Sequence, residues 1–335
     1  MENKNEDQLH WADEKEVVSS NRPIKYLLHL LKFFPSPLVH VLIFPVGFFY
    51  FIFSKRARTE CKRYQKILKE FSLGKIPKKV SSYTQIVSFS LCVLEKLEGW
   101  LGKFYYKELH TFDDDMKDLQ EGLEEGHGAI LLGSHLGNLE LMRSLSNFGE
   151  NGVKRKFSVT TIMEINATEQ FNKTLKEINP NVDLKVISPS EIGPDTIIRL
   201  EEELKQGGLL VIAADRTSAK NRSRIIKKNF LGKEAEFPYG TFLMVALLKF
   251  PVYHVYAMRS KTITLKPIYN MYVEKSQVNL NCSRNERDSR IDELCCEYVG
   301  KLEKFCMLYP YQWYNFFNFW NSNENDSKNA SFKST

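Results

Sequence analysis

Between residues 128 and 213 the chain alternates short apolar runs with amphipathic stretches, and this alternation limits the possible folds more than any other feature. The apolar runs are rich in aliphatic or β-branched residues, which predicts strands at residues 128–132, 157–163, 184–187 and 209–213. The stretches between them have helical spacing, at residues 139–148, 168–178 and 196–206. Since strands that alternate with helices pair in parallel, the sequence predicts an α/β fold with a mostly parallel central sheet flanked by helices.

Outside this stretch the sequence predicts further helices and strands. It also divides the whole chain into four regions. Helices are expected at residues 55–71, 83–101, 113–124, 241–250 and 288–308, and strands at 104–109, 252–258 and 263–269, the last two as a pair. With 335 residues, 43% of them hydrophobic, the chain can bury a sizeable core. We expect a polar amino-terminal segment at 1–23, a membrane-associated or transmembrane helical segment at 24–54, a large α/β domain at 55–320 and a disordered tail at 321–335.

The amino-terminal segment raises the question of a membrane. Residues 38–53 are apolar except for His40, and a basic stretch at 55–69 follows at once. The run is shorter than the roughly 20 residues that cross a bilayer as a helix, and the polar stretch before it is not that of a cleavable signal peptide. Three interpretations are open: a span with its basic flank in the cytoplasm, an interfacial helix pair, or a buried helical hairpin broken at Pro45 and Gly47. Length and flanking charge favour membrane contact over burial.

Composition argues against several classes of protein. The net charge of +6 is modest and spread along the chain, whereas nucleic-acid binding usually needs a concentrated basic stripe. Such a charge suits an anionic membrane surface or an acidic carrier. The six cysteines are scattered without the paired spacing of a zinc site, which indicates free thiols in a reducing compartment. The 23 Phe and 15 Tyr fit a protein that works beside lipid, or equally an aromatic core.

His135 and Glu140 are the first candidate catalytic pair. His135 follows the predicted strand at 128–132, and Gly137 and Asn138 allow the backbone to turn sharply before Glu140 enters a helix. The turn can bring the carboxylate against one ring nitrogen of the imidazole, where it fixes the tautomer while the other nitrogen acts as a general base. The substrate's own hydroxyl would then be the nucleophile. The alternative is a hydrogen-bonded structural histidine, because this spacing also occurs by chance.

Two further groups of residues belong to the same hypothesis. Asp215 and Arg216 follow the predicted strand at 209–213, so they lie at the same sheet edge as His135. Arginine can bind a phosphate or a developing oxyanion while the aspartate holds it, although a surface ion pair explains the two residues equally well. The third group opens the apolar helix at 241–250, where it can wall an acyl groove or form an ordinary loop-to-helix junction; it comprises Phe237, Pro238 and Gly240.

Together these motifs resemble a known family. The matching segments are Gly133-Ser134-His135-Leu136-Gly137-Asn138-Leu139-Glu140, Asp215-Arg216, Phe230-Leu231-Gly232 and Phe237-Pro238-Tyr239-Gly240. In this order and at these separations they are similar to the bacterial lipid A biosynthesis acyltransferases, the lauroyl and myristoyl transferases of the lysophospholipid acyltransferase superfamily. A subgroup of predicted acyltransferases is more similar still, through His10-Trp11-Ala12, Gly193-Pro194-Asp195-Thr196 and Gln312-Trp313-Tyr314-Asn315-Phe316-Phe317. The resemblance covers about residues 10–320.

The resemblance implies an acyltransferase domain at 55–320, held by its amino-terminal helix at the cytoplasmic face of the bacterial inner membrane. The implied reaction moves a fatty acyl chain from an acyl carrier protein or coenzyme A thioester to the hydroxyl of a membrane lipid or glycolipid. His135 is then the general base and Glu140 its orienting partner. The implied substrate-binding residues are Gly137, Asn138, Asp215, Arg216, Phe237, Pro238 and Gly240. Neither a cofactor, a metal nor a nucleic-acid partner is implied.

One departure from the family pattern concerns the acceptor. Lipid A enzymes carry a Tyr-Arg-Pro-like segment on the strand after the catalytic helix, and here Ile162-Met163-Glu164 occupies that place. The acceptor-binding arginine is therefore absent. Another lipid, or a glycolipid or polyene-type precursor, fits the sequence as well as the lipid A disaccharide does.

Two rival functions follow from the same residues. A metal-dependent hydrolase could use His135, Glu140 and Asp215 as ligands, since sets of histidine and carboxylate bind metals. With seven histidines in the chain and none of the others near these motifs, such a site would have few ligands. A membrane-associated scaffold that kept the fold and lost its chemistry is the second rival. The presence of both His135 and Glu140 argues against it.

Overall fold

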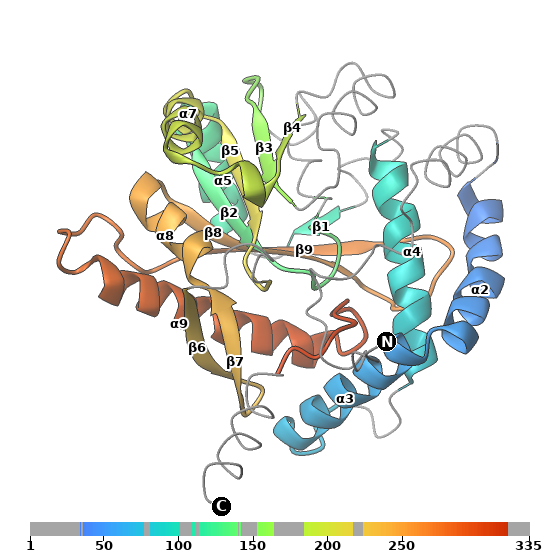
Figure 1. Ribbon diagram of the computed structural model, residues 1–335. Helices are drawn as coiled ribbons and strands as arrows, with labels where there is room; N and C mark the ends of the chain where they lie inside the picture. Colours follow the sequence, from blue (N-terminus) through green and yellow to red (C-terminus); the bar gives the residue numbers. More distant parts are fainter. Residues whose placement is uncertain are drawn as a thin grey trace, which may run out of the picture.

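A seven-stranded sheet forms the centre of the part of the chain that the structure describes (Figure 1). The structure is a computed structural model, and it describes residues 34, 36–76, 81–100, 109–111, 114–139, 141, 153–163, 184–216 and 224–320. The strand order is β1-β9-β8-β2-β5-β3-β4, and every neighbouring pair is parallel except β8 and β9. The strands are β1 (Leu109–Thr111), β2 (Ala129–Gly133), β3 (Val159–Ile162), β4 (Leu184–Ile187), β5 (Leu209–Ala213), β8 (Val252–Arg259) and β9 (Tyr269–Lys275). The predicted α/β fold with a mostly parallel sheet is confirmed.

The central strands are continuous apolar runs because both faces of the sheet are covered. Every residue of β2, β3 and β8 is buried, as is typical of parallel strands between helical layers. Helix α5 (Asp114–Glu124) covers one face, where Leu119 and Leu123 pack with alternate residues of β2, β5 and β8. Helices α7 (Pro194–Lys205), α8 (Tyr239–Leu248) and α9 (Arg287–Leu308) cover the other face. The sheet therefore lies between two apolar cores.

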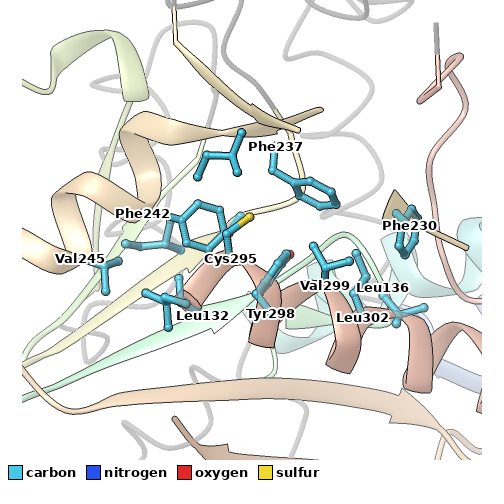
Figure 2. Packing of buried hydrophobic residues seen from close by; sticks show 14 of the residues in the cluster. Leu132, Leu136, Phe230, Phe237, Phe242, Val245, Cys295, Tyr298, Val299 and Leu302 are labelled. Atoms are coloured by element: carbon cyan, nitrogen blue, oxygen red, sulfur yellow. The ribbon is translucent and has the colours of Figure 1, made fainter. Parts of the chain in front are cut away.

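Figure 2 shows the larger core, in which α8 and α9 meet the sheet and an aromatic cluster. Phe242 of α8 packs edge-on against Tyr298 of α9, with 5.6 Å between ring centres, and Phe237 contacts the same tyrosine at 6.3 Å. The hydroxyl of Tyr298 donates to the carbonyl of Gly133 at the end of β2, at 3.0 Å. The core thus reaches directly beneath the strand end that carries the candidate histidine.

A two-stranded hairpin, β6 (Ile225–Phe230) and β7 (Lys233–Pro238), extends from this core and was not predicted. Its turn consists of Leu231 and Gly232, with φ of 51° and 78°. Two successive residues at positive φ are the geometry of a tight turn whose twist matches that of the paired strands. Leucine at such a position is unfavourable, and the backbone N–H of Leu231 donates to the carboxylate of Glu303. The hairpin explains why the Phe-Leu-Gly segment precedes the Phe-Pro-Tyr-Gly segment so closely.

Three helices lie together beside the sheet (Figure 1): α2 (Ser36–Phe53), α3 (Lys55–Phe71) and α4 (Ser82–Trp100). Helix α2 continues through Pro45, so the predicted break at Pro45 and Gly47 is wrong. The chain bends by 91° between α2 and α3, at Ser54, whose hydroxyl caps α3 by accepting from the N–H of Ala57 at 3.3 Å. Within the described ranges no single helix is long and apolar enough to cross a membrane, although the bent pair α2–α3 meets the length and composition criteria jointly.

Helix α2 has an outer face of large apolar residues, and its inner side combines apolar packing with one buried polar contact. The inner His40 is buried, with Nε2 at 3.5 Å from carboxylate oxygens of both Glu95 and Glu98 on α4. Arg259 of β8 lies 3.2 Å from Glu95, which also accepts from the hydroxyl of Tyr269. The outer residues are large and exposed: Leu38, Val41, Leu42, Val46, Phe48, Phe49, Tyr50, Ile52 and Phe53. Burial of the whole segment, the third interpretation, is therefore wrong for this face.

Several predicted elements differ from the structure or lie outside the described residues. The predicted strand at 263–269 is wrong: β9 begins at Tyr269, and the exposed residues before it form a loop. Of the strand predicted at 104–109, only Leu109 lies within the described residues, and it is the first residue of β1. The predicted helix at 168–178 and the expected segments at 1–23 and 321–335 lie outside the described residues, as does the predicted helix at 139–148 except for Leu139 and Leu141.

Candidate functional site

His135 and Asp215 meet at the carboxyl-terminal edge of the sheet because their strands are adjacent and in register. Strands β2 and β5 pair in parallel with Gly133 opposite Ala213, and each candidate residue comes two positions later. Nδ1 of His135 lies 2.8 Å from Oδ1 of Asp215, and the backbone N–H of His135 donates to Oδ2 at 3.0 Å. The carboxylate thus holds both the ring and the backbone of the histidine. The prediction that the two residues share one sheet edge is confirmed.

A third donor reaches Asp215 from the carboxyl-terminal part of the chain. The indole Nε1 of Trp313 donates to Oδ2 at 3.3 Å, and both residues are buried. The next residue, Tyr314, donates its N–H to the carbonyl of His135 at 2.9 Å, and Leu136 forms a β-bridge with Trp313. The segment that follows α9 therefore contacts both the histidine loop and the carboxylate that follows β5. The sequence of this segment is similar to that of a subgroup of predicted acyltransferases, but the contact between Trp313 and the carboxylate was not predicted.

This geometry determines which nitrogen of His135 can do chemistry. A buried carboxylate accepts hydrogen bonds, so its contact with Nδ1 places the proton there and leaves the lone pair on Nε2. The side chain of His135 is 33% exposed, whereas Asp215 is fully buried. A partly exposed histidine, supported by a buried acceptor on one ring nitrogen, is the arrangement that proton abstraction from a bound hydroxyl requires.

The charges around the pair keep the imidazole neutral and the carboxylate ionised. Burial, and after it the positive charge of Arg216, lowers the pKa of His135 below its usual value of 6.5. Burial alone would raise the pKa of Asp215, but the charge of His135, which is protonated at the acidic pH where Asp215 titrates, and its hydrogen bonds outweigh burial and hold that pKa below the usual 3.8. At neutral pH the site therefore holds an unprotonated base next to a carboxylate anion.

Arg216 lies along the carboxyl-terminal segment and not on an open surface. Its Nη2 donates to the carbonyl of Tyr314 at 2.9 Å, and its guanidinium carbon lies 5.6 Å from the ring centre of Phe317. Burial lowers the pKa of this guanidinium to about 10, so it stays charged at neutral pH. Because Asp215 is buried and bound to His135 and Trp313, the interpretation of the two residues as a surface ion pair is wrong.

Gly137 and Asn138 shape the histidine loop from within. Gly137 has a φ of 73°, and a Cβ there would lie 2.3 Å from the carbonyl oxygen of Ala257. Asn138 is fully buried; its backbone N–H donates to the same carbonyl at 2.8 Å and its side chain faces the hydroxyl of Tyr269 at 3.5 Å. These contacts press the loop onto β8 and β9. They give both residues a structural role, and substrate contact by either residue stays a prediction.

The structure does not bring the third predicted group to the histidine. Phe237 is fully buried in the aromatic core, Pro238 is buried as the residue before α8, and Gly240 is exposed in the first turn of α8. Phe237 relates to the site only through Tyr298, which it contacts and which donates to Gly133. An acyl groove walled by these residues stays a prediction, while the alternative of a loop-to-helix junction agrees with their positions.

Glu140 lies outside the described residues, so its predicted role is not tested. In the structure the acceptor on Nδ1 of His135 is Asp215. The sequence signal for this was present, because an aspartate that follows a strand paired with the strand before the histidine must lie near it. Sequence spacing alone favoured the nearer carboxylate.

The described residues contain no group of three or more His, Cys, Asp or Glu side chains that could hold a metal ion. Asp215 has both oxygens engaged by His135 and Trp313. Two basic residues of β6 are also engaged: Lys227 pairs with Glu234 at 3.1 Å and Lys228 with Asp292 at 2.7 Å. These contacts leave His135 and Asp215 as the chemical centre of the described site.

The chain was also compared with known proteins. No model of a known protein family matches it, and a search of curated proteins finds no match either.

Proposed function

We propose that the protein is a membrane-associated O-acyltransferase that moves a fatty acyl chain from a thioester donor, acyl carrier protein or coenzyme A, to a lipid or glycolipid hydroxyl. The observation that carries the proposal is the pair formed by His135 and the buried Asp215, with Nε2 left as the base. The motif resemblance to lipid A acyltransferases supplies the substrate class, and the pair supplies the chemistry such a transfer needs.

The reaction needs no covalent enzyme intermediate. Nε2 of His135 takes the proton of the acceptor hydroxyl while its oxygen attacks the carbonyl carbon of the thioester. The imidazolium that forms is stabilised by Asp215. The tetrahedral oxyanion collapses, the carbon–sulfur bond breaks, and the proton passes from His135 to the thiolate. The products are an ester and a thiol, and the histidine returns to its neutral form.

Arg216 supplies positive charge to the same reaction. Its charge is close enough to His135 to lower the pKa of the imidazole. The same charge stabilises a developing oxyanion, because a fixed cation beside the base interacts favourably with an anion that forms there. Lowering the pKa of His135 also ensures that the base is unprotonated when the acceptor binds.

The exposed apolar face of α2 supports an interfacial location. A helix that presents a row of large apolar residues, followed by a basic helix bent away from it, can lie in the headgroup layer with its apolar face among the acyl chains. We propose that this face rests on the cytoplasmic side of the bacterial inner membrane. A lipid acceptor would then reach His135 without leaving the bilayer surface.

The test is acyl transfer by the purified full-length protein. Labelled acyl carrier protein thioester and, separately, labelled acyl-coenzyme A are incubated with extracted membrane lipids, and the products are resolved by mass spectrometry. The parent protein should form an acylated lipid, and His135→Ala should lose roughly a hundredfold or more of the rate, as expected for a missing general base. Equal transfer by His135→Ala, or thioester hydrolysis with no acylated lipid, would overturn the proposal. Mass spectrometry of the product also identifies the acceptor.

A further inference from the structure

A cationic cleft lies between α3 and the hairpin β6–β7, apart from the catalytic pair. Its volume is about 670 Å³, within the range of roughly 300–1,000 Å³ usual for small-molecule sites. Gly232 at the hairpin turn comes close to α3, since a Cβ there would lie 3.5 Å from the ring of Phe71 (Figure 1). The cleft is lined by Lys62, Arg63, Lys66, Ile67, Gly232, Lys233, Glu234, Asn318 and Trp320.

The lining carries four cationic side chains and one carboxylate, and that carboxylate is already used. Glu234 pairs with Lys227 at 3.1 Å. Arg63 has a partner in Glu60 at 3.3 Å. Lys66 has a partner in Glu70 at 4.0 Å. For the other two lysines, Lys62 of α3 and Lys233 of β7, no ion pair with a carboxylate is found among the residues that the structure describes. Two facing elements thus bring uncompensated positive charge to one cleft, and such a site attracts an anion.

One wall of the cleft belongs to a chain segment that also contacts His135. Trp320 forms part of the wall, and its indole N–H donates to the carbonyl of Phe230 at 3.2 Å, which fixes the ring in place. The same chain segment begins at Tyr314, whose N–H donates to the carbonyl of His135. A stretch of this length spans at most about 20 Å even when fully extended, so the cleft lies within reach of a long, thin ligand whose other end is at His135.

The ligand must therefore be anionic at one end, long, and reactive at the other. A phosphate group has several acceptor oxygens and close to two negative charges, which matches two free lysines beside an arginine. Ile67 and the face of Trp320 offer an apolar surface to the chain that follows the phosphate. On the premise of the proposed acyl transfer, we propose that the cleft binds the phosphate at the head of the pantetheine arm, the group that acyl carrier protein and coenzyme A share.

The test compares two probes that differ only in that phosphate. Binding of phosphopantetheine and of pantetheine to the full-length protein is measured by calorimetry. The parent should bind phosphopantetheine about tenfold or more tightly, because hydrogen bonds between charged groups contribute more than neutral ones. The double variant Lys62→Gln/Lys233→Gln should bind both probes equally weakly. The preference of the parent should also decrease as salt is raised.

The matched control removes two lysines that lie near the cleft but do not line it. Lys69 is on the same helix and Lys75 follows it; both are exposed. Lys69→Gln/Lys75→Gln has the same change in net charge and should keep the preference for the phosphate. Equal binding of the two probes by the parent, or an unchanged preference in Lys62→Gln/Lys233→Gln, would overturn the assignment.

Two competition arms identify the source of the phosphate. Coenzyme A and acyl carrier protein carrying its phosphopantetheine are each titrated against bound phosphopantetheine, and displacement by either supports the assignment and names the donor. Vesicles of anionic phospholipid form the third arm. If the vesicles bind through Lys62 and Lys233 while phosphopantetheine does not, the cleft recognises lipid headgroups and the assignment fails.

Failure of this inference can be distinguished from failure of the proposed function. With acyl-pantetheine, which lacks the phosphate, the parent and Lys62→Gln/Lys233→Gln should transfer at equal rates, whereas with acyl-phosphopantetheine the variant should show a raised KM. If transfer depends on His135 but the KM for acyl-phosphopantetheine is the same in the parent and in Lys62→Gln/Lys233→Gln, the assignment of the cleft is overturned and the proposed function is not. If binding depends on the phosphate but no donor supports acyl transfer, the assignment of the cleft is retained and the proposed acyltransferase function is overturned.

Discussion

The indole Nε1 of Trp313 and the backbone N–H of His135 both donate to Oδ2 of Asp215, so Trp313 contacts the carboxylate that holds the candidate base. With Nδ1 of His135 on the other oxygen, Asp215 accepts three hydrogen bonds in a buried position. A carboxylate held in this way has little freedom to rotate. The orientation of His135 therefore depends on a residue of the carboxyl-terminal segment that has no contact with solvent.

Replacing this donor should weaken catalysis more than binding. Trp313→Phe keeps an aromatic ring beside Tyr64 and Phe230, whose ring centres lie 4.9 and 5.3 Å from that of Trp313, but removes the N–H. Losing one hydrogen bond to a charged group costs about 1.5–3 kcal/mol. We expect kcat to fall at least about tenfold with KM nearly unchanged, as measured by steady-state acyl transfer.

A double-mutant cycle tests whether Trp313 acts through Asp215. In an Asp215→Asn background the further effect of Trp313→Phe on kcat should be small, because the carboxylate that it positions is absent. Independent, additive losses would show that Trp313 affects the rate by another route.

Asp215→Asn should itself abolish most of the activity while keeping the shape of the site. The amide can turn its NH₂ towards Nδ1, which favours the tautomer with the proton on Nε2, where the base is needed. We expect a loss of roughly a hundredfold or more in kcat, with the folded state checked by circular dichroism. Activity close to that of the parent would mean that another carboxylate, with Glu140 the first to test, orients His135.

The pH dependence of kcat/KM should reflect the lowered pKa of His135. Only the neutral imidazole accepts a proton, so activity should rise with pH through that pKa, and the acidic limb should lie below pH 6.5. Arg216→Gln removes the positive charge that lowers the pKa most after burial, so the limb should move to higher pH. Lys96→Gln should move it in the same direction but less, because Lys96 contributes the weakest of the charge effects. A limb that stays fixed in Arg216→Gln would contradict this.

Two glycines of the predicted site should respond oppositely to alanine. At Gly137 the positive φ and the carbonyl of Ala257 leave no room for a Cβ, so Gly137→Ala should destabilise the protein by about 2 kcal/mol or more. At Gly240, in the first turn of α8, no atom lies within 4 Å of the added Cβ. Gly240→Ala should leave the free energy of unfolding unchanged or raise it by up to about 1 kcal/mol. Denaturant unfolding measures both, and equal effects would contradict the geometry of the loop.

The outer face of α2 should bind lipid. Val46 of α2 and Ile198 of α7 are 57% and 56% exposed, so they form a matched pair on different surfaces. Val46→Glu places a charge where acyl chains are expected and should reduce co-sedimentation with anionic vesicles roughly tenfold. Ile198→Glu should leave it unchanged. If both variants sediment like the parent, α2 does not contact the bilayer.

The sequence predicted the bounds of a helix or strand correctly where the local sequence pattern and the burial of the residues agree. Strand β5 was predicted at its observed bounds, because an apolar run between Gly207-Gly208 and Asp215 has clear limits. Helix α3 was predicted equally well, at residues 55–71, although its cap Ser54 was not predicted. The hairpin was missed because its turn places Leu231 in a conformation that leucine rarely adopts. The strand at 263–269 was predicted too early in the chain, because three of its apolar residues are exposed and do not contribute to the core. These are Ile263, Leu265 and Ile268.

The sequence predicted where the site lies on the sheet, but not which side chains form hydrogen bonds with one another there. Parallel strands place His135 and Asp215 at one edge, and that much follows from the order of elements. Which carboxylate faces Nδ1 depends on the register between β2 and β5, which no local pattern encodes. The contact from Trp313 joins residues 98 positions apart and depends on how the segment after α9 folds back over the sheet. Such contacts are decided by packing, not by spacing along the chain.

The three residues of the candidate site, His135, Asp215 and Trp313, are also synthesised at different times. Asp215 lies 80 positions after His135 and Trp313 a further 98 positions on. During synthesis from the amino end, α2 leaves the ribosome before any residue of the candidate site, and the indole of Trp313 follows Asp215. A nascent chain can thus expose its apolar helix while its histidine is still without a fixed carboxylate, and an incomplete translation product that stops before Trp313 has the base and its partner but not the contact that aligns them.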